Sequence, residues 1–204
     1  MNDWILISID LFNQSDRRII WNLFLAFIPA IVSYFLFSFS AKRNLLWWIL
    51  LIIFLAFLPN APYVLTDSIH IIELSQKDYP LWAIIFILIP QYLLFITTGF
   101  GAYAISLIRL DRYLADLIEK QYIFLINGVL HFLCTIGIYI GRFERFNSWD
   151  LVVKPGMVIL TVLRNLLDLE KLSSIIISFF LIWLLAEFIK LVNRSFALSQ
   201  SSNN

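Results

Sequence analysis

Five long stretches of almost uninterrupted apolar residues constrain this chain more than any other feature. A helix needs about 20 apolar residues to cross the hydrocarbon core of a bilayer. The stretches lack the alternation of apolar and polar residues that a membrane β-barrel requires. The sequence therefore predicts an all-α fold, a polytopic transmembrane helix bundle of about five spans. The predicted spans are about 21–39, 45–60, 81–107, 122–140 and 175–192.

The composition agrees with a membrane location and excludes several other classes of protein. The chain is 61% hydrophobic and only 14% charged, whereas soluble domains are about 45–50% apolar and about 25% charged. Its length of 204 residues suits a single integral membrane domain over residues 1–204. A net charge of +1 offers no basic surface for a nucleic acid. The single Cys134 provides neither a disulfide framework nor a cysteine metal site.

The start and the end of the chain are predicted to lie outside the spans. The N-terminus begins with Asp3 and has no basic start or small-residue cleavage site, so we do not expect a cleavable signal peptide. Residues 1–16 are expected to lie at the membrane interface as a partly apolar lead-in. The polar residues 199–204 are expected to form a disordered tail.

The second apolar stretch is interrupted by the sequence Leu58-Pro-Asn-Ala-Pro-Tyr-Val-Leu-Thr-Asp-Ser-Ile-His70. Each proline lacks an amide donor and disfavours helix at the residue before it. We therefore expect the second span to end or break near Pro59, with Asn60 capping a new helix. Residues 62–76 have an amphipathic pattern, which predicts a short helix lying along the membrane interface.

Two further segments complete a set of two or three interfacial amphipathic helices. Residues 151–168 have apolar and polar residues on opposite helix faces, after a break at Pro155-Gly156. Residues 109–121 carry six charged side chains beside a few leucines, which predicts a solvated connecting helix.

A second polar stretch, Gly141-Arg-Phe-Glu-Arg-Phe-Asn-Ser-Trp-Asp150, follows the fourth span. With five spans, the connections after the second and the fourth spans lie on the same side of the membrane. We therefore expect the two polar stretches to converge, with both arginines on Asp67 and with His70 donating to Asp150. The candidate polar site comprises Asn60, Asp67, His70, Arg142, Arg145, Asn147, Ser148 and Asp150.

Two interpretations of this polar site remain open. One is an ion-pair network that fixes two interfacial helices to the bundle. The other is a binding site for a polar head group or a small anion, with the arginines as bidentate donors and His70 as a proton carrier. Asp67 and His70 lack a third ligand at suitable spacing, so no metal site is predicted. No cofactor motif is present, and no cofactor is expected.

Taken together, the two stretches resemble an uncharacterised family of bacterial multi-pass membrane proteins, known only as a domain of unknown function. The resemblance covers roughly residues 20–195 and departs at Phe146, where such proteins tend to have Trp. It implies a multi-pass protein of the bacterial plasma (inner) membrane and brings no activity with it. Lys and Arg residues number 8 on the N-terminal side of the membrane and 7 on the other, so the positive-inside rule does not decide the orientation.

Three polar residues fall within predicted spans, where unpaired polar groups are costly. We expect His131 to be neutral and hydrogen-bonded to a neighbouring helix, with a functional role as the alternative. Gln91 and Asn127 are expected to form hydrogen bonds between helices.

Three functions are compatible with these features. The first is a binding or transport component that holds a small polar or lipid head-group ligand at one membrane interface. The second is an accessory or structural subunit with a membrane-protein partner. The third is an intramembrane enzyme acting on a lipid-linked substrate with Asp67, His70 and Asp150 as acid and base groups. No recognised catalytic motif supports the enzyme, so the sequence favours a non-enzymatic role.

Overall fold

The protein is an all-α membrane protein, as the apolar stretches predict. The computed structural model describes residues 3–38, 43–147 and 149–202, and no strand occurs in these ranges. Five of its helical stretches are long and apolar enough to cross a membrane, which makes this a multi-pass membrane protein. These stretches are Arg17–Ser38, Leu45–Ser75, Leu81–Ala115, Lys120–Phe143 and Leu169–Phe196.

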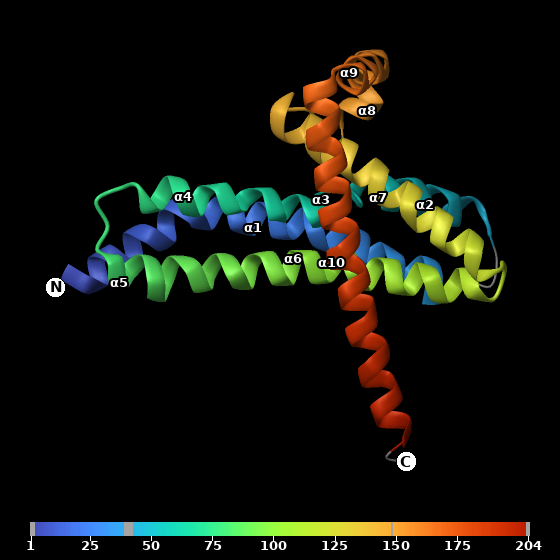
Figure 1. The fold of residues 1–204 in the computed structure, drawn as a ribbon, viewed down its shortest axis with the longest axis horizontal. Coiled ribbons are helices and arrows are strands. Elements are labelled where there is room, and N and C mark those ends of the chain that lie inside the picture. The colour runs from blue at the N-terminus through green and yellow to red at the C-terminus, as the bar shows by residue number, and fades with distance from the viewer. Residues whose placement is uncertain (1–2, 39–42, 148, 203–204) are drawn as a thin grey trace.

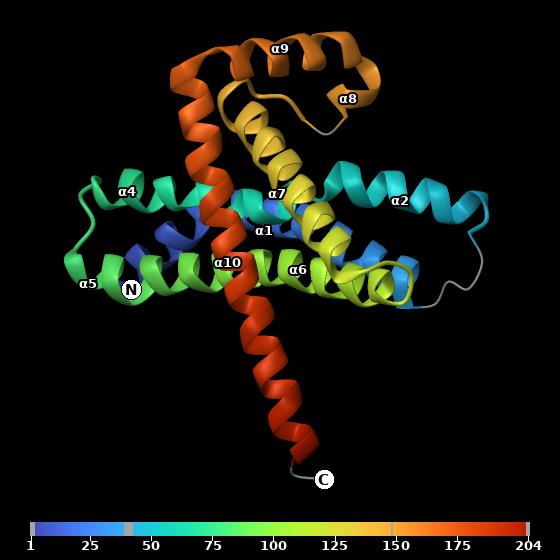
Figure 2. The ribbon, with the colours of Figure 1, turned by 45° about the vertical axis from the view of Figure 1, so that its right-hand side comes forward.

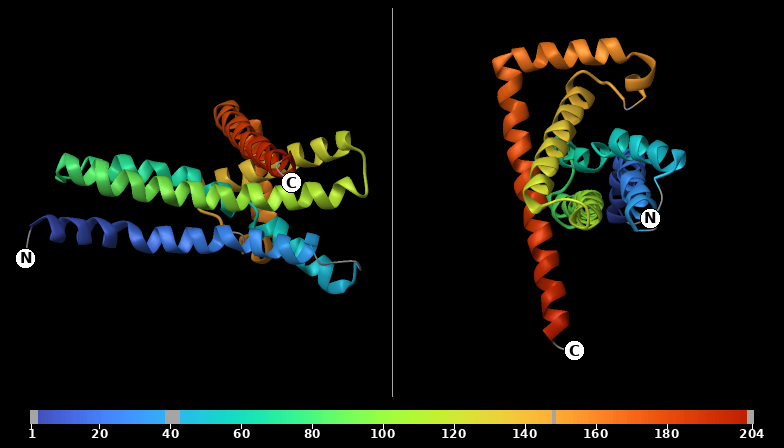
Figure 3. Two further views of the ribbon diagram at one scale, coloured as in Figure 1. Left: turned by 90° about the horizontal axis from the view of Figure 1, so that it is seen from below. Right: turned by 90° about the vertical axis from the view of Figure 1, so that its right-hand side faces the viewer.

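The first three stretches run alongside one another, and the last two cross them (Figures 1 and 3). Helix α1 (Asp3–Ser38) packs mainly on α6 (Ile89–Ala115), with α2 (Leu45–Phe57) beside it. Helix α7 (Lys120–Phe143) runs obliquely over this layer, and α10 (Leu169–Ser202) crosses it steeply while contacting α6 and α7. The short α8 (Asp150–Val153) and α9 (Pro155–Leu167) join α7 to α10 at one end of the molecule (Figure 2).

The second apolar stretch breaks near Pro59 as predicted, because α2 ends at Phe57 and Leu58 and Pro59 form a turn. The helical segments that follow form one candidate span with α2, whereas a separate interfacial helix was predicted over residues 62–76. The chain stays helical through α3 (Asn60–Tyr63), the 3₁₀ segment η1 (Val64–Ser68) and α4 (Ile69–Ser75). Pro59 has φ −62° and ψ −23°, values that suit a helix. The tighter turns around the prolines keep backbone bonds, such as Tyr63 N–H to the Pro59 carbonyl at 3.1 Å. The prolines therefore follow the end of α2, and tighter helical turns carry the chain on toward Ser75.

The third span extends further than predicted, because α6 continues to Ala115. It begins with α5 (Leu81–Ala83) and the π-helical segment η2 (Ile84–Leu88), directly before Pro90. A π-turn is a common way to accommodate an irregularity of the hydrogen-bond ladder in a long helix. Residues 109–115 are thus part of the span. Arg109 Nη1 donates to the Ala30 carbonyl of α1 at 2.6 Å, so this arginine joins two helices instead of lying in a solvated connector.

The ends of the chain also differ from expectation. Residues 3–16 form one continuous helix with the first span, and α10 includes residues 199–202, which were expected to be disordered. Residues 203–204 of the expected tail lie outside the described residues. Asp10 fixes the start of α1, because its Oδ2 accepts from Tyr79 Oη at 2.5 Å and from Gln14 Nε2 at 3.0 Å.

We predict that Tyr79→Phe weakens the attachment of Asp10, at the start of α1, to residue 79 in a pH-dependent way. The hydrogen bond from Tyr79 is the main cause that lowers the pKa of Asp10 below its ordinary value of 3.8. A lowered carboxyl pKa stabilises the folded state above the unfolded pKa, and this contribution is lost as the pH falls through the folded value. Carbon NMR of the Asp10 carboxyl should show its pKa rising toward 3.8 in the variant. An unchanged titration of Asp10 would contradict this account.

Gly99 allows α6 and η1 to approach closely. A Cβ atom at Gly99 would lie 2.7 Å from Val64 Cγ1, whereas one at Gly101 would meet nothing within 4 Å. Contacts below 3.0 Å force neighbouring atoms to shift. The small residue therefore sets the distance between the second and the third spans.

Gly99→Ala is expected to destabilise the protein by about 1–3 kcal/mol through overpacking, measured as the midpoint of thermal unfolding in detergent. Gly101→Ala is the matched control and should be neutral or slightly stabilising, because alanine favours helix. Combining Gly99→Ala with Val64→Ala should recover much of the loss, since the two side chains share one contact. Equal effects of the two single glycine variants would refute the close approach.

Candidate functional site

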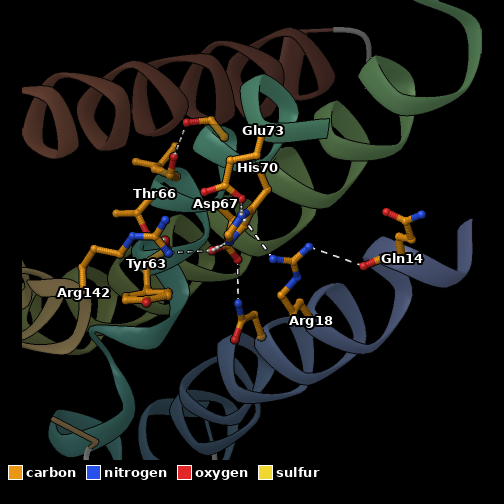
Figure 4. A network of polar contacts seen from close by, with 11 residues as sticks. Gln14, Arg18, Tyr63, Thr66, Asp67, His70, Glu73 and Arg142 are labelled. Atoms are coloured by element: carbon orange, nitrogen blue, oxygen red, sulfur yellow. Dashed lines mark hydrogen bonds and ion pairs between the residues drawn. The ribbon is translucent and has the colours of Figure 1, made fainter. Parts of the chain in front are cut away.

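The carboxylate of Asp67 is the centre of a polar network between helices. Its residue is only 4% exposed. Asn22 Nδ2 of α1 donates to Asp67 Oδ2 at 2.6 Å. On the other oxygen, Oδ1, Arg142 Nη1 of α7 lies at 3.6 Å and His70 Nε2 of α4 at 3.8 Å. Figure 4 shows the side chains converging from these separate helices. One carboxylate thus joins α1, η1, α4 and α7.

His70 connects this carboxylate to a second acidic residue. Its Nδ1 lies 2.6 Å from Glu73 Oε2 and 3.2 Å from Arg18 Nη1. Both ring nitrogens of His70 therefore face carboxylates, Glu73 on one side and Asp67 on the other (Figure 4). Only the protonated imidazolium can donate on both sides. Arg18 can only donate, so its contact requires Nδ1 as an acceptor and competes with a donation from Nδ1 to Glu73.

The prediction that both arginines pair with Asp67 is half right. Arg142 does so, but Arg145 is exposed and has no contact with Asp67 within the described ranges. Arg145 adopts a left-handed conformation with φ 57°. Directly after it, the Phe146 amide donates to the Ile140 carbonyl at 3.2 Å. Helix α7 ends at Phe143 with Glu144 as its C-cap, and the left-handed Arg145 turns the chain away directly after it.

The second polar stretch otherwise serves mainly to start the next helix. The backbone N–H of Asn147 donates to Asp150 Oδ2 at 2.8 Å, an arrangement typical of a helix N-terminus. His70 does not bond Asp150 in the part of the chain that the structure describes, and its contacts are those of the Asp67 network. Ser148 lies outside the described residues.

A cavity of about 750 Å³ opens beside the network, between α1, the α2–α3 junction, α7 and the segment leading to α9. Most of its wall is apolar, including Phe24, Phe57 and Val158. Residues with polar side chains also line it, among them Asn22, Asn60 and Asn147. Asn22 belongs both to the cavity wall and to the Asp67 network. The cavity therefore combines apolar space with polar groups at its edge, as binding sites for small molecules do.

Two glycines of α7 make room for this cavity. Gly137 and Gly141 both line it, and a Cβ atom at Gly137 would lie 2.9 Å from Pro59 Cβ. Gly137 therefore lets α7 pack closely against the proline turn of the second span. Asn60 lines the cavity from the same turn, and its Nδ2 donates to the Phe57 carbonyl at 3.1 Å.

The sequence interpretation missed Arg18 and Asn22, which approach the site from α1. They are four residues apart and therefore lie on one face of the helix. Asn22 follows Trp21 inside an otherwise apolar span. A polar side chain at that depth, in register with an arginine, was a usable signal.

The polar residues of the fourth span do not belong to the Asp67 network but contact α6. Tyr103 Oη of α6 lies 2.8 Å from His131 Nδ1, which places the expected interhelical hydrogen bond. Asn127 Nδ2 likewise reaches Asp111 of α6 at 2.6 Å. For Gln91 the expected bond is not found, since its buried Oε1 has no partner among the described residues. In those same ranges, no three His, Cys, Asp or Glu side chains are grouped closely enough to hold a metal ion.

Asp67→Asn should destabilise the fold by about 3 kcal/mol, because it leaves the buried contact of Arg142 without its charge. The asparagine has nearly the same shape and can still accept from Asn22. The loss of stability therefore measures the contribution of the negative charge of Asp67. Asp78→Asn is the control, since Asp78 is exposed. Chemical unfolding in detergent should separate the two variants. Equal stability of Asp67→Asn and wild type would show that the network is not a structural centre.

Comparison with known proteins yields one match. A family model described as "Protein of unknown function (DUF1361)" matches residues 21–185. This range includes Asp67, His70, Arg142 and the whole cavity wall. No curated protein matches the chain. No solved structure matches it either.

Proposed function

From the premise that the chain belongs to the DUF1361 family of proteins of unknown function, we propose that it binds an anionic amphiphile at one side of the membrane. The apolar part of the ligand occupies the cavity, and its anionic head lies at Arg142. The observation that carries this proposal is the cavity of about 750 Å³ with apolar walls and an asparagine edge next to the Asp67 network.

The size and the lining of the cavity favour an amphiphile over a small free anion. Ligand sites of about 300–1,000 Å³ are common for molecules of drug size. Apolar walls offer little to a fully solvated ion but favour an acyl or prenyl chain. The apolar residues Trp149 and Leu151, which precede α9, form one wall. They are 67% and 47% exposed, so this wall of the cavity lies at the surface of the molecule.

Arg142 is the group best suited to the anionic head. Its side chain is 24% exposed and follows Gly141, a residue of the cavity wall. Its ion pair with Asp67 is a single contact of 3.6 Å, whereas a guanidinium has five N–H donors. Asp67 orients the guanidinium, and the remaining donors are available for a phosphate or carboxylate. Asn60 and Asn147 provide further polar groups at the cavity wall.

Arg142→Gln should lower the content of anionic lipids that remain bound after purification by about tenfold or more, because a charge-assisted contact contributes about 1.5–3 kcal/mol. Native mass spectrometry from mild detergent measures this content. Arg145→Gln is the matched control, since Arg145 is a nearby arginine outside the network. An equal effect of the two variants would exclude a specific head-group site.

A second pair of variants tests the cavity itself. Ala56 lines the cavity, whereas its neighbour Leu55 does not and is 43% exposed. Ala56→Phe should displace bound amphiphiles of either charge, and Leu55→Phe should leave them in place. Retention of every bound lipid in Ala56→Phe would overturn the proposal.

A further inference from the structure

A second buried polar cluster lies where α6, α7 and α10 meet, away from the cavity. Lys190 of α10 is only 3% exposed, and its Nζ lies 2.9 Å from Asp111 Oδ2 of α6 and 3.1 Å from Glu187 Oε1. Asn127 Nδ2 of α7 donates to the other oxygen of Asp111, Oδ1, at 2.6 Å. The pair Glu187–Lys190 within α10 is therefore part of a larger network that joins three helices.

The charges of this cluster do not balance. The two carboxylates of Asp111 and Glu187 share the single ammonium group of Lys190, so the cluster has a formal charge of −1 when the histidine is neutral. The side chain of Lys190 is 3% exposed, that of Asp111 17% and that of Glu187 38%. An uncompensated charge that faces apolar helices or lipid is unfavourable by several kcal/mol. One additional positive charge would bring the cluster to zero.

The neighbouring groups do not supply that charge. From α7, His131 and Cys134 face the cluster or its neighbour Tyr103 of α6. Tyrosine and cysteine are neutral at physiological pH. Arg109 is also on α6, but its guanidinium donates to the Ala30 carbonyl of α1.

Two buried polar atoms of α7 provide a place for water at this cluster. His131 is 0% exposed and Asn127 is 4% exposed. Within the residues that the structure describes, His131 Nε2 and Asn127 Oδ1 have no hydrogen-bond partner. Buried polar groups of this kind are commonly satisfied by internal water. Water at these atoms would connect His131 with the Asn127–Asp111 contact and would carry protons to the carboxylates.

We propose that Asp111, Glu187 and Lys190, together with Asn127 and His131, form a proton-binding site in the interior of the helix bundle. In the uptake step a hydronium ion donates a proton to a carboxylate oxygen of the Asp111–Glu187 pair. One O–H bond of the hydronium breaks, one carboxylic O–H bond forms, and a water molecule is left. The charge of the cluster changes from −1 to zero.

This site shares no residue with the cavity, so it stands independently of the proposed amphiphile binding. The Lys190–Asp111 contact joins α10 to α6, and α10 also contacts α7 and α9. Uptake of a proton at this contact would alter the attachment of α10 to the other helices. The site can therefore couple a change of helix arrangement to the proton concentration on one side of the membrane.

Infrared spectroscopy of the purified full-length protein in lipid nanodiscs tests the proposal. The wild type at neutral pH should show the C=O stretch of a protonated carboxylic acid, with a shift in D₂O. Glu187→Gln should remove this band although Asp111 remains. In that variant the charge of the Asp111 carboxylate is already balanced by the Lys190 ammonium, so no proton is taken up. Asp111→Asn should remove it for the same reason. A purely structural ion pair predicts no such band and no effect of Glu187→Gln.

The controls separate this site from other carboxylates and from a metal cation. Asp116→Asn, at an exposed position one turn beyond Asp111 on α6, should leave the band unchanged. If Asp111→Asn does not fold, Glu187→Gln still decides, since Lys190 keeps a partner. A band that persists in Glu187→Gln overturns the proposal. A missing wild-type band combined with thermal stabilisation by Na⁺ also overturns it, because a metal cation would then supply the balancing charge.

Discussion

The buried carboxylate of Asp67 is the interaction on which the arrangement of this molecule depends most. It accepts from Asn22 of α1 and contacts Arg142 of α7, which is 75 residues further along the chain. In water such a pair would contribute little. At 4% exposure, the carboxylate instead requires its partners, because an unpaired buried charge is strongly unfavourable. Among apolar helices that can slide past one another, a charge with few allowed positions fixes their relative placement.

Small residues complement this polar constraint. Gly99 lets the second and third spans meet at Val64, and Gly137 lets α7 meet Pro59. Both contacts involve the segment that carries the two prolines and Asp67. Close approach there positions the carboxylate to reach α1 and α7, while the apolar side chains around it create the cavity. Structural and ligand-binding interpretations of the polar site are thus compatible, because the same contacts that hold the helices also shape the space between them.

Much of the fold could be predicted from apolar length alone, because crossing a bilayer imposes a nearly fixed helix length. The five spans follow from this rule, and so does the same-side argument that brought Asp67 and Arg142 together. The errors arose where local rules compete with tertiary contacts. The break at Pro59 was predicted correctly, but residues 62–76 were expected as a separate interfacial helix, whereas tight turns let short helical segments follow α2 to Ser75. Arg109 looked solvated by its charge, yet α1 offers it a backbone carbonyl.

The candidate site was predictable only in its central pair and His70. The partners Asn22 and Arg18 come from a span whose rotation about its own axis is set by contacts with α6, and a single sequence does not contain that angle. The Asp111–Lys190 contact shows the same difficulty, since it joins a presumed connector to the last span. The two clusters differ in the number of positively charged side chains relative to carboxylates. The Asp67 network has two arginines for two carboxylates and is balanced by its own residues. The cluster at Lys190 has one cation for two carboxylates, and this difference is the basis of the proton-binding site proposed there.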